Sequence, residues 1–333
     1  MDPIALTREL VALETPTGGE AAAVDFLAAA LAKAGYRVTR QPVTPGRDNL
    51  YAWRERPELV FSTHLDCVPP FVPPREDADR LWGRGTCDAK GVAAAMVAAA
   101  ERLAENGERR VGLLFLVGEE NGSDGARKAP ELEPRGRYLI NGEPTENRLV
   151  VGQKGALRVD LEASGHAAHS AYPDEGRSAI DALLETLDYL RGLQLPTDPV
   201  LGPTTYNIGI IEGGVAPNVF APWASAQLLF RVVEPTGALR QRVAACAAQG
   251  VTVQFPVELP CYKAPRPAPP GWDTTVVSYA SDLPLLTAAF GEGYQLGPGS
   301  ILVAHTDDEH IVKADLLRGV ELYVRLAQDL LKR

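Results

Sequence analysis

Phe61-Ser62-Thr63-His64-Leu65-Asp66, Gly83-Arg84-Gly85-Thr86-Cys87-Asp88 and Leu113-Leu114-Phe115-Leu116-Val117-Gly118-Glu119-Glu120 are three stretches that end in residues able to bind a metal. The first and third are short apolar runs of strand type, and each stops where the polar residues begin. In open α/β sheets, ligands bind beyond the carboxyl ends of the strands. The three stretches therefore predict an α/β sheet with a metal site at one edge.

Two later stretches extend the same pattern. Tyr138 to Glu143 and Ser300 to His305 are apolar runs that each end in a potential ligand, and we expect both to be strands. The chain has only five histidines, and two of them fall at such strand ends. A mixed set of imidazole and carboxylate ligands suits Zn²⁺ or a similar divalent ion. The candidate ligands are His64, Asp88, Glu119 or Glu120, Glu143 and His305.

Spacing within each stretch suggests a division of roles. His64 and Asp66 lie on one face of an extended chain, so the carboxylate can accept the proton of the imidazole nitrogen that is not bound to metal. Asp88 precedes an expected helix over residues 91–105, where it either caps the helix or bridges two cations. Glu119 and Glu120 point in different directions, so one can bind metal while the other moves the proton of a bound water. The simpler alternatives are a surface histidine and two exposed loop carboxylates.

Composition narrows the classes of function. The chain has 333 residues, 45% hydrophobic and 23% charged, with a formal net charge of −10. Binding a polyanion needs clustered Lys and Arg, so nucleic acid is not an expected partner. There is no apolar run long enough to span a bilayer. The N-terminal residues do not resemble a secretory signal, and we expect a cytoplasmic protein.

The order of expected elements predicts two domains. Residues 1–154 and 263–333 form an α/β domain with a mixed central sheet, into which residues 155–262 are inserted. The inserted segment has the order β-α-β-β-α-β, which is that of a ferredoxin-like unit. Its loops and strands contain three candidate functional residues, for which surface, turn and strand roles are the simpler interpretations: His169, Asn218 and Arg231.

Taken together, these motifs resemble the di-zinc deacylase and exopeptidase family that includes acetylornithine deacetylase, succinyl-diaminopimelate desuccinylase, aminoacylases and glutamate carboxypeptidases. The resemblance runs nearly end to end. It implies a zinc-peptidase-like catalytic domain and a ferredoxin-like lid or dimerisation domain, with two Zn²⁺ per subunit that Co²⁺ or Mn²⁺ could replace. The motifs that carry it are His64-Leu65-Asp66, Gly83 to Gly91, Gly118-Glu119-Glu120, Gly142-Glu143-Pro144-Thr145 and Ala304 to Glu309.

The resemblance also implies a role for each site residue. His64 and Glu143 would bind one zinc, Glu120 and His305 the other, and Asp88 would bridge them. Asp66 would orient His64, and Glu119 would be the general base. A cis peptide is expected at Asp88-Ala89. His169 would reach the active site of the partner subunit in a homodimer formed through the lid, while the substrate would contact Asn218, Arg231 and Gly299.

The activity expected from the resemblance is hydrolysis of an N-acyl amino acid by metal-bound hydroxide, with an N-acetyl group on ornithine or lysine first among the substrates. Such an enzyme would serve amino-acid biosynthesis. Two alternatives remain open: a dipeptidase or carboxypeptidase of the same family, and an inactive protein that keeps its metals as a binding or scaffold protein. The acidic run Asp307-Asp308-Glu309 either favours a basic substrate or, as the preferred interpretation, caps the last helix.

Overall fold

The computed structural model describes residues 1–332, and these divide into two compact units. The first contains Met1–Val151, Lys263–Val276 and Ser281–Arg333, and the second contains Gly152–Tyr262 and Val277–Ala280. The second unit thus begins three residues before the expected boundary at residue 155. It also takes in a short segment, Val277–Ala280, that the sequence assigns to the last part of the chain.

The first unit is built on a mixed sheet whose order is β1-β2-β6-β3-β7-β18-β8-β16, with β17 beside β8. Its central strands β6, β3, β7 and β18 run parallel. Strands β3 and β6 are buried along their whole length, as strands covered on both faces must be. The bounds are β1 Arg37–Thr44, β2 Arg47–Trp53, β3 Leu59–His64, β6 Val111–Leu116, β7 Tyr138–Asn141, β8 Leu149–Gln153, β16 Tyr262–Lys263, β17 Thr274–Val277 and β18 Glu292–Gln295.

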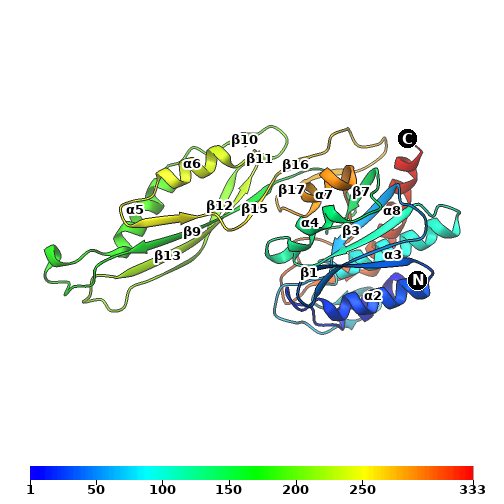
Figure 1. Ribbon diagram of the computed structural model, residues 1–333, viewed down its shortest axis with the longest axis horizontal. Coiled ribbons are helices and arrows are strands. Elements are labelled where there is room, and N and C mark those ends of the chain that lie inside the picture. Colours follow the sequence, from blue (N-terminus) through cyan, green and yellow to red (C-terminus); the bar gives the residue numbers. More distant parts are fainter. Residues whose placement is uncertain (333) are drawn as a thin grey trace. The chain divides into compact units, whose positions relative to one another are not determined.

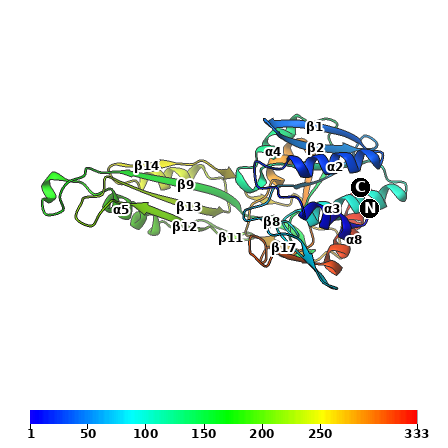
Figure 2. The same ribbon diagram turned by 90° about the horizontal axis from the view of Figure 1, so that it is seen from below.

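Helices cover both faces of this sheet (Figure 1 and Figure 2). Leu59 and Phe61 share one core with α1, α2, α3 and α8. Val60 alternates to the other face, as the two-residue period of a strand requires. Helix α7 contacts β7 and β18, and α4 contacts α7. The helices are α1 Pro3–Val11, α2 Ala21–Lys33, α3 Lys90–Glu105, α4 Asp124–Lys128, α7 Leu283–Phe290 and α8 Lys313–Leu331, with 3-10 turns η1 Glu119–Asn121 and η2 Ala129–Glu131.

The second unit is a five-stranded antiparallel sheet, with the order β12-β13-β9-β14 and the short strand β15 also paired with β9, and two helices pack on one face. Its chain order β-α-β-β-α-β confirms the ferredoxin-like prediction. A short hairpin of two strands with two residues each, β10 and β11, precedes β12. The bounds are β9 Gly155–Ser164, η3 Pro173–Glu175, α5 Ala179–Arg191, β10 Thr197–Asp198, β11 Gly202–Pro203, β12 Thr205–Gly213, β13 Trp223–Val232, α6 Gly237–Ala245, β14 Val251–Gln254 and β15 Glu258–Leu259.

Two sequence predictions near the C-terminus are wrong. The run from Ser300 to His305 forms turns instead of a strand, and the strand that enters the sheet is β18, which ends at Gln295. Leu302 is 80% exposed, so the apolar letters of this run do not mark a buried segment. The last helix begins at Lys313 instead of the expected Glu309, because His310–Val312 forms β19. Strand β19 pairs with β5 (Arg80–Trp82), which pairs with β4 (Arg75–Glu76).

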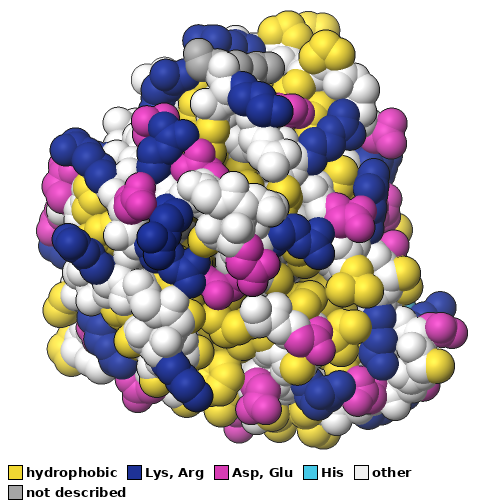
Figure 3. All heavy atoms as spheres, turned by 90° about the vertical axis from the view of Figure 1, so that its right-hand side faces the viewer, with side chains coloured by type: hydrophobic (Ala, Val, Ile, Leu, Met, Phe, Trp, Pro, Cys, Tyr) yellow, Lys and Arg dark blue, Asp and Glu magenta, His cyan; other side chains and the backbone are white. Residues whose placement is uncertain are grey.

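Three further observations bear on the sequence predictions. The Asp88-Ala89 peptide is cis, as expected. Among the described residues no helix has the length and apolar character needed to cross a membrane. On the face of the first unit in Figure 3, Lys and Arg are interspersed with Asp and Glu, so this face carries no basic patch of the kind that binds nucleic acid.

Candidate metal centre

The first of two ligand clusters lies at the carboxyl ends of two parallel strands and the start of a helix. His64 is the last residue of β3, Glu143 follows the end of β7, and Asp88 precedes α3. Potential ligand atoms of these three residues all lie within 4.8 Å of one another. The Nε2 atom of His64 is 3.2 Å from Oδ1 of Asp88. All three side chains are buried, so the sheet edge holds them in a preformed group.

The second cluster shares Asp88 with the first. Asp88, Glu120 and His305 also place potential ligand atoms within 4.8 Å of one another. The Nε2 atom of His305 is 3.0 Å from Oε1 of Glu120 and 3.3 Å from Oδ2 of Asp88. One carboxylate oxygen of Asp88 therefore faces His64 and the other faces His305. This arrangement suits a residue that bridges two cations.

Asp66 connects the first histidine to the turn that carries the two glutamates. Its Oδ1 lies 3.4 Å from Nδ1 of His64 and accepts a hydrogen bond from the backbone N–H of Glu119 at 3.1 Å. Its Oδ2 accepts from Thr17 Oγ1 at 2.7 Å and from the N–H of Glu120 at 3.1 Å. Burial alone would raise the pKa of Asp66, but the hydrogen bonds with His64, Thr17 and Glu120 lower it. The backbone carbonyl of Asp66 is nearer to Nδ1 of His64, at 3.0 Å, so Asp66 orients the imidazole through its main chain and side chain and orients the start of η1 through its carboxylate.

Glu119 lies beside the clusters without belonging to either. It opens η1 directly after Gly118, whose φ of +79° is accessible to glycine at little cost. Glu120, the next residue, joins the second cluster. Burial raises the pKa of Glu119 well above its ordinary value, and the negative charge of Glu143 adds to this effect. A partly buried carboxylate outside the ligand set is suited to accept and return a proton.

The charges of the centre fit a pair of divalent cations. Burial, with the charge of neighbouring carboxylates, raises the pKa of Glu143 and of Glu120 above the ordinary value. Hydrogen bonds to Asp88 and Glu120 raise the pKa of His305 to about 10. Three carboxylates and two imidazoles at one point therefore favour bound positive charge. The imidazole and oxygen donors suit Zn²⁺, and the shared Asp88 gives each ion a ligand in common with the other.

Gly299 lies in the loop that leads to His305. Its φ is +89°, and a Cβ atom there would lie 2.7 Å from Cβ of Cys87, so both conformation and close packing require glycine. Its carbonyl accepts a hydrogen bond from the N–H of Glu146 at 2.8 Å. These contacts place Gly299 next to the loop of Asp88, but they account for the glycine through packing alone.

Two buried acidic residues of this unit were not assigned a site role from the sequence. Asp282 is 2% exposed, and neither of its carboxylate oxygens has a well-aligned hydrogen bond. Burial raises the pKa of Asp282 to about 6, and the nearby hydroxyl of Ser123 offsets only part of this effect. Glu309 is fully buried and does not cap α8, so the preferred interpretation of the acidic run is wrong for this residue. Asp282 has no sequence signal beyond its residue type, whereas Glu309 is the last residue of the motif from Ala304 to Glu309.

The remaining candidates lie in the second unit, and they are not all close together. The N–H of Ser170 donates to the carbonyl of Asn218 at 3.0 Å, and His169 forms an isolated bridge with Val219. These loops adjoin the end of the sheet where Trp223 pairs with Ser164. Arg231 lies opposite Ala156, eight residues beyond Trp223 along β13. At about 3.3 Å per residue, Arg231 is therefore roughly 26 Å from Trp223. The structure brings His169 and Asn218 together and separates Arg231 from them.

Comparisons with known proteins agree with this geometry. Residues 60–329 match the profile described as "Peptidase family M20/M25/M40". A "Peptidase M20 domain-containing protein" of Schizosaccharomyces pombe is 38% identical over 338 residues, which cover 97% of this chain and 83% of that protein. A "Probable carboxypeptidase" of Aspergillus fumigatus is 38% identical over 378 residues, which cover 98% of this chain and 86% of that protein.

Among solved structures, a tripeptidase from Staphylococcus aureus has a similar fold. Its TM-score is 0.78 at 21% identity, and the match covers 97% of this chain and 96% of that one. Identity this low supports the fold and leaves the substrate open.

Proposed function

The chain belongs to the peptidase family M20/M25/M40, and from this premise we propose that it is a dinuclear metal-dependent carboxypeptidase, which hydrolyses the last amide bond of a short peptide. The observation that carries the proposal is the pair of three-residue clusters that share Asp88, with Glu119 beside them. The named relatives that are 38% identical over most of their length favour a peptide substrate. The N-acyl amino acid first expected from the sequence therefore becomes the second candidate.

Two groups of residues that could hold cations support this proposal. His64 and Glu143 would hold one, Glu120 and His305 the other, and Asp88 both. Zn²⁺ is the ion that this donor set fits best, and when bound, such a pair polarises a carbonyl and lowers the pKa of a water. Asp66 keeps the imidazole of His64 oriented. Glu119 accepts the proton of the attacking water and returns it to the departing amine.

Replacement of Glu119 tests its role. General-base catalysis contributes on the order of 10² to 10⁴ in rate, so Glu119→Gln should lower kcat by that factor. Its metal content by mass spectrometry should stay at the wild-type value, because Glu119 belongs to neither cluster. Glu131→Gln, at an exposed position, is the matched control and should keep full activity. Near wild-type turnover in Glu119→Gln with metals bound would remove the proposed base.

A panel of substrates tests the reaction. Dipeptides and tripeptides with a free C-terminus should be hydrolysed with a kcat/KM at least tenfold above that of N-acetyl amino acids. The same peptides with an amidated C-terminus should be poor substrates. Preference for N-acetyl-ornithine or N-acetyl-lysine would instead support the deacetylase, and no hydrolysis by the metal-loaded protein would support the scaffold alternative.

The distance between Arg231 and His169 supports a site shared by two subunits. Roughly 26 Å of β13 separates Arg231 from the sheet end that the loops of His169 and Asn218 adjoin, so a small substrate cannot contact both places within one sheet. A homodimer in which the partner subunit supplies His169 and Asn218 would remove this difficulty. Glu119→Gln and His169→Ala proteins, each inactive, should then recover part of the activity after mixing and re-dimerisation. Absence of recovery, with dimers confirmed, would contradict donation by the partner.

The second unit also offers a surface for such a dimer. Strand β12 is an edge strand, with Ile210 and Ile211 48% and 55% exposed. Helix α5 exposes Leu184 and Tyr189 to 50% and 57%. An apolar edge strand pairs readily with another chain. Ile211→Lys should yield monomers by light scattering, whereas Val200→Lys, at an exposed apolar residue outside β12 and α5, should not.

A further inference from the structure

Glu309 makes a dense set of hydrogen bonds to the loop that carries Asp88. Its Oε1 accepts from the backbone N–H groups of Gly85, Cys87 and Asp88 at 2.9, 3.3 and 3.2 Å. Its side chain is fully buried, and its own carbonyl accepts from the N–H of Gly83 at 3.0 Å. One residue therefore fixes the backbone of residues 83–88 at four points.

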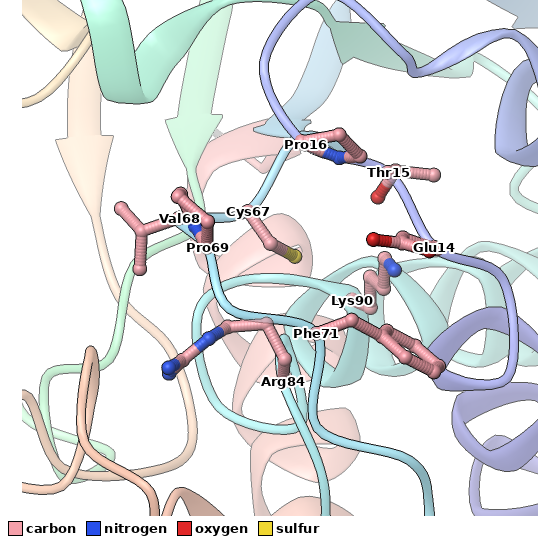
Figure 4. Close-up of a pocket in the computed structure, with 9 residues that line it drawn as sticks. All are labelled: Glu14, Thr15, Pro16, Cys67, Val68, Pro69, Phe71, Arg84 and Lys90. Atoms are coloured by element: carbon pink, nitrogen blue, oxygen red, sulfur yellow. The ribbon is translucent and has the colours of Figure 1, made fainter.

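Arg84 completes this arrangement from the same loop. Its Nη1 donates to Oε2 of Glu309 at 2.7 Å and to the carbonyl of Thr306 at 3.1 Å, and its Nε donates to the carbonyl of Pro70. The side chain is 3% exposed. Arg84 is one of the residues around a small pocket with Cys67 and Lys90, but Figure 4 shows its guanidinium group turned away from these two. The guanidinium group is thus used for the contacts with Glu309 and Thr306.

These contacts join the two loops that supply ligands to the second cluster. Asp88 ends the segment that Glu309 binds, and His305 precedes Glu309 by four residues in a loop of turns. His305 has φ +63°, which is uncommon for a residue other than glycine, and its side chain is 47% exposed, with Nε2 in contact with Glu120 and Asp88. The 3.3 Å distance between His305 Nε2 and Asp88 Oδ2 depends on how these two loops are held.

We propose that Glu309 is a positioning residue, which sets the separation of Asp88 and His305 and so the affinity of the second cation site, while Arg84 balances its charge. The inference rests on the proposed function only in requiring that the centre binds cations. Asp88 belongs to both clusters, but His64 and Glu143 lie on β3 and after β7, outside the loops that Glu309 joins. The second site has two ligands, Asp88 and His305, on those loops, so removing Glu309 should weaken it more than the first.

The test is a titration of the metal-free protein with Co²⁺, in which the visible absorption of the bound Co²⁺ and the heat of binding are measured. Glu309→Gln places an NH₂ group against either Arg84 or the three backbone donors, because an amide has only one acceptor oxygen. A His305→Ala reference protein should lack the second site and so identifies that site's signal in the titration. In Glu309→Gln we expect the second site to bind Co²⁺ at least tenfold more weakly than in wild type, and the first site to stay within threefold of wild type. Asp308→Asn, at the exposed neighbouring residue, is the matched control and should change neither site.

Two results would overturn the proposal: both sites within threefold of wild type, or both weakened by the same factor, which is what general loosening of the fold would produce. If circular dichroism shows that Glu309→Gln is unfolded, Arg84→Lys replaces it. Lysine keeps the charge and loses the contacts of the guanidinium fork, so a selective loss of at least threefold is expected. A wild-type protein that binds no Co²⁺ would refute the proposed function, whereas unchanged sites in the variants refute only the role of Glu309.

Discussion

Replacing Asp282 by Asn should stabilise the metal-free protein at neutral and alkaline pH. The carboxyl group is fully buried without a well-aligned hydrogen bond, and burial raises its pKa to about 6 from an ordinary value of 3.8. A folded-state pKa above the unfolded one means that the folded protein holds this proton more tightly. Stability is therefore lost as pH rises from about 4 to 6 and stays lower above that range.

The magnitude follows from the difference between the two pKa values. At about 1.4 kcal/mol per pKa unit, ionised Asp282 lowers the free energy of unfolding by about 3 kcal/mol at pH 8. Asn carries no charge, although its buried amide also lacks partners at a smaller cost. The stability difference between Asp282→Asn and wild type should thus grow by about 2 to 3 kcal/mol between pH 4 and pH 8.

Urea unfolding in the presence of EDTA, at several pH values, measures this difference directly. EDTA is needed because bound cations near the centre would also lower the pKa of Asp282. Asp307→Asn, at an exposed position, should stay within about 0.5 kcal/mol of wild type throughout. A difference that does not change with pH, or an Asp282→Asn protein that is less stable at pH 8, would show that the charge of Asp282 is compensated in the fold.

Two other changes have definite expected outcomes. Gly91→Ala would place a Cβ atom 2.1 Å from the backbone carbonyl oxygen of Thr86, so it should destabilise the protein by about 3 kcal/mol in urea unfolding. In the control Gly237→Ala the Cβ atom meets nothing within 4 Å, so this change should stabilise the protein by up to about 1 kcal/mol. Equal effects of the two substitutions would contradict the packing around Gly91. Because hydrogen bonds raise the pKa of His305 to about 10, the imidazole is protonated at pH 7 without metal and must lose that proton to become a ligand. Zinc binding should then release at least one proton per chain at pH 7, measured by calorimetry in buffers of different ionisation enthalpy, and His305→Ala should release fewer.

Local sequence was sufficient for the elements that depend on local pattern. Strands β3 and β6 are buried along their whole length and coincide with the apolar runs that predict them, although β3 continues through Ser62 and Thr63 to His64. The ferredoxin-like unit follows from alternation and helical periodicity in the same way. The positions of His64, Glu120 and Glu143 follow from these strands, since residues beyond parallel strand ends meet at one edge.

Tertiary structure alone decided what lies in the loops. The apolar run before His305 has the composition of a strand, yet the sheet position beside β7 is taken by β18, and His305 reaches the centre from a loop of turns. Glu309 and Asp282 are acidic residues that any pattern would place at the surface, and both are buried. The amino-acid sequence determined which strands form and which ligands end them, because those depend on neighbouring residues. The bonds from Glu309 to the Asp88 loop join positions more than two hundred residues apart, and only the folded chain can bring such groups together.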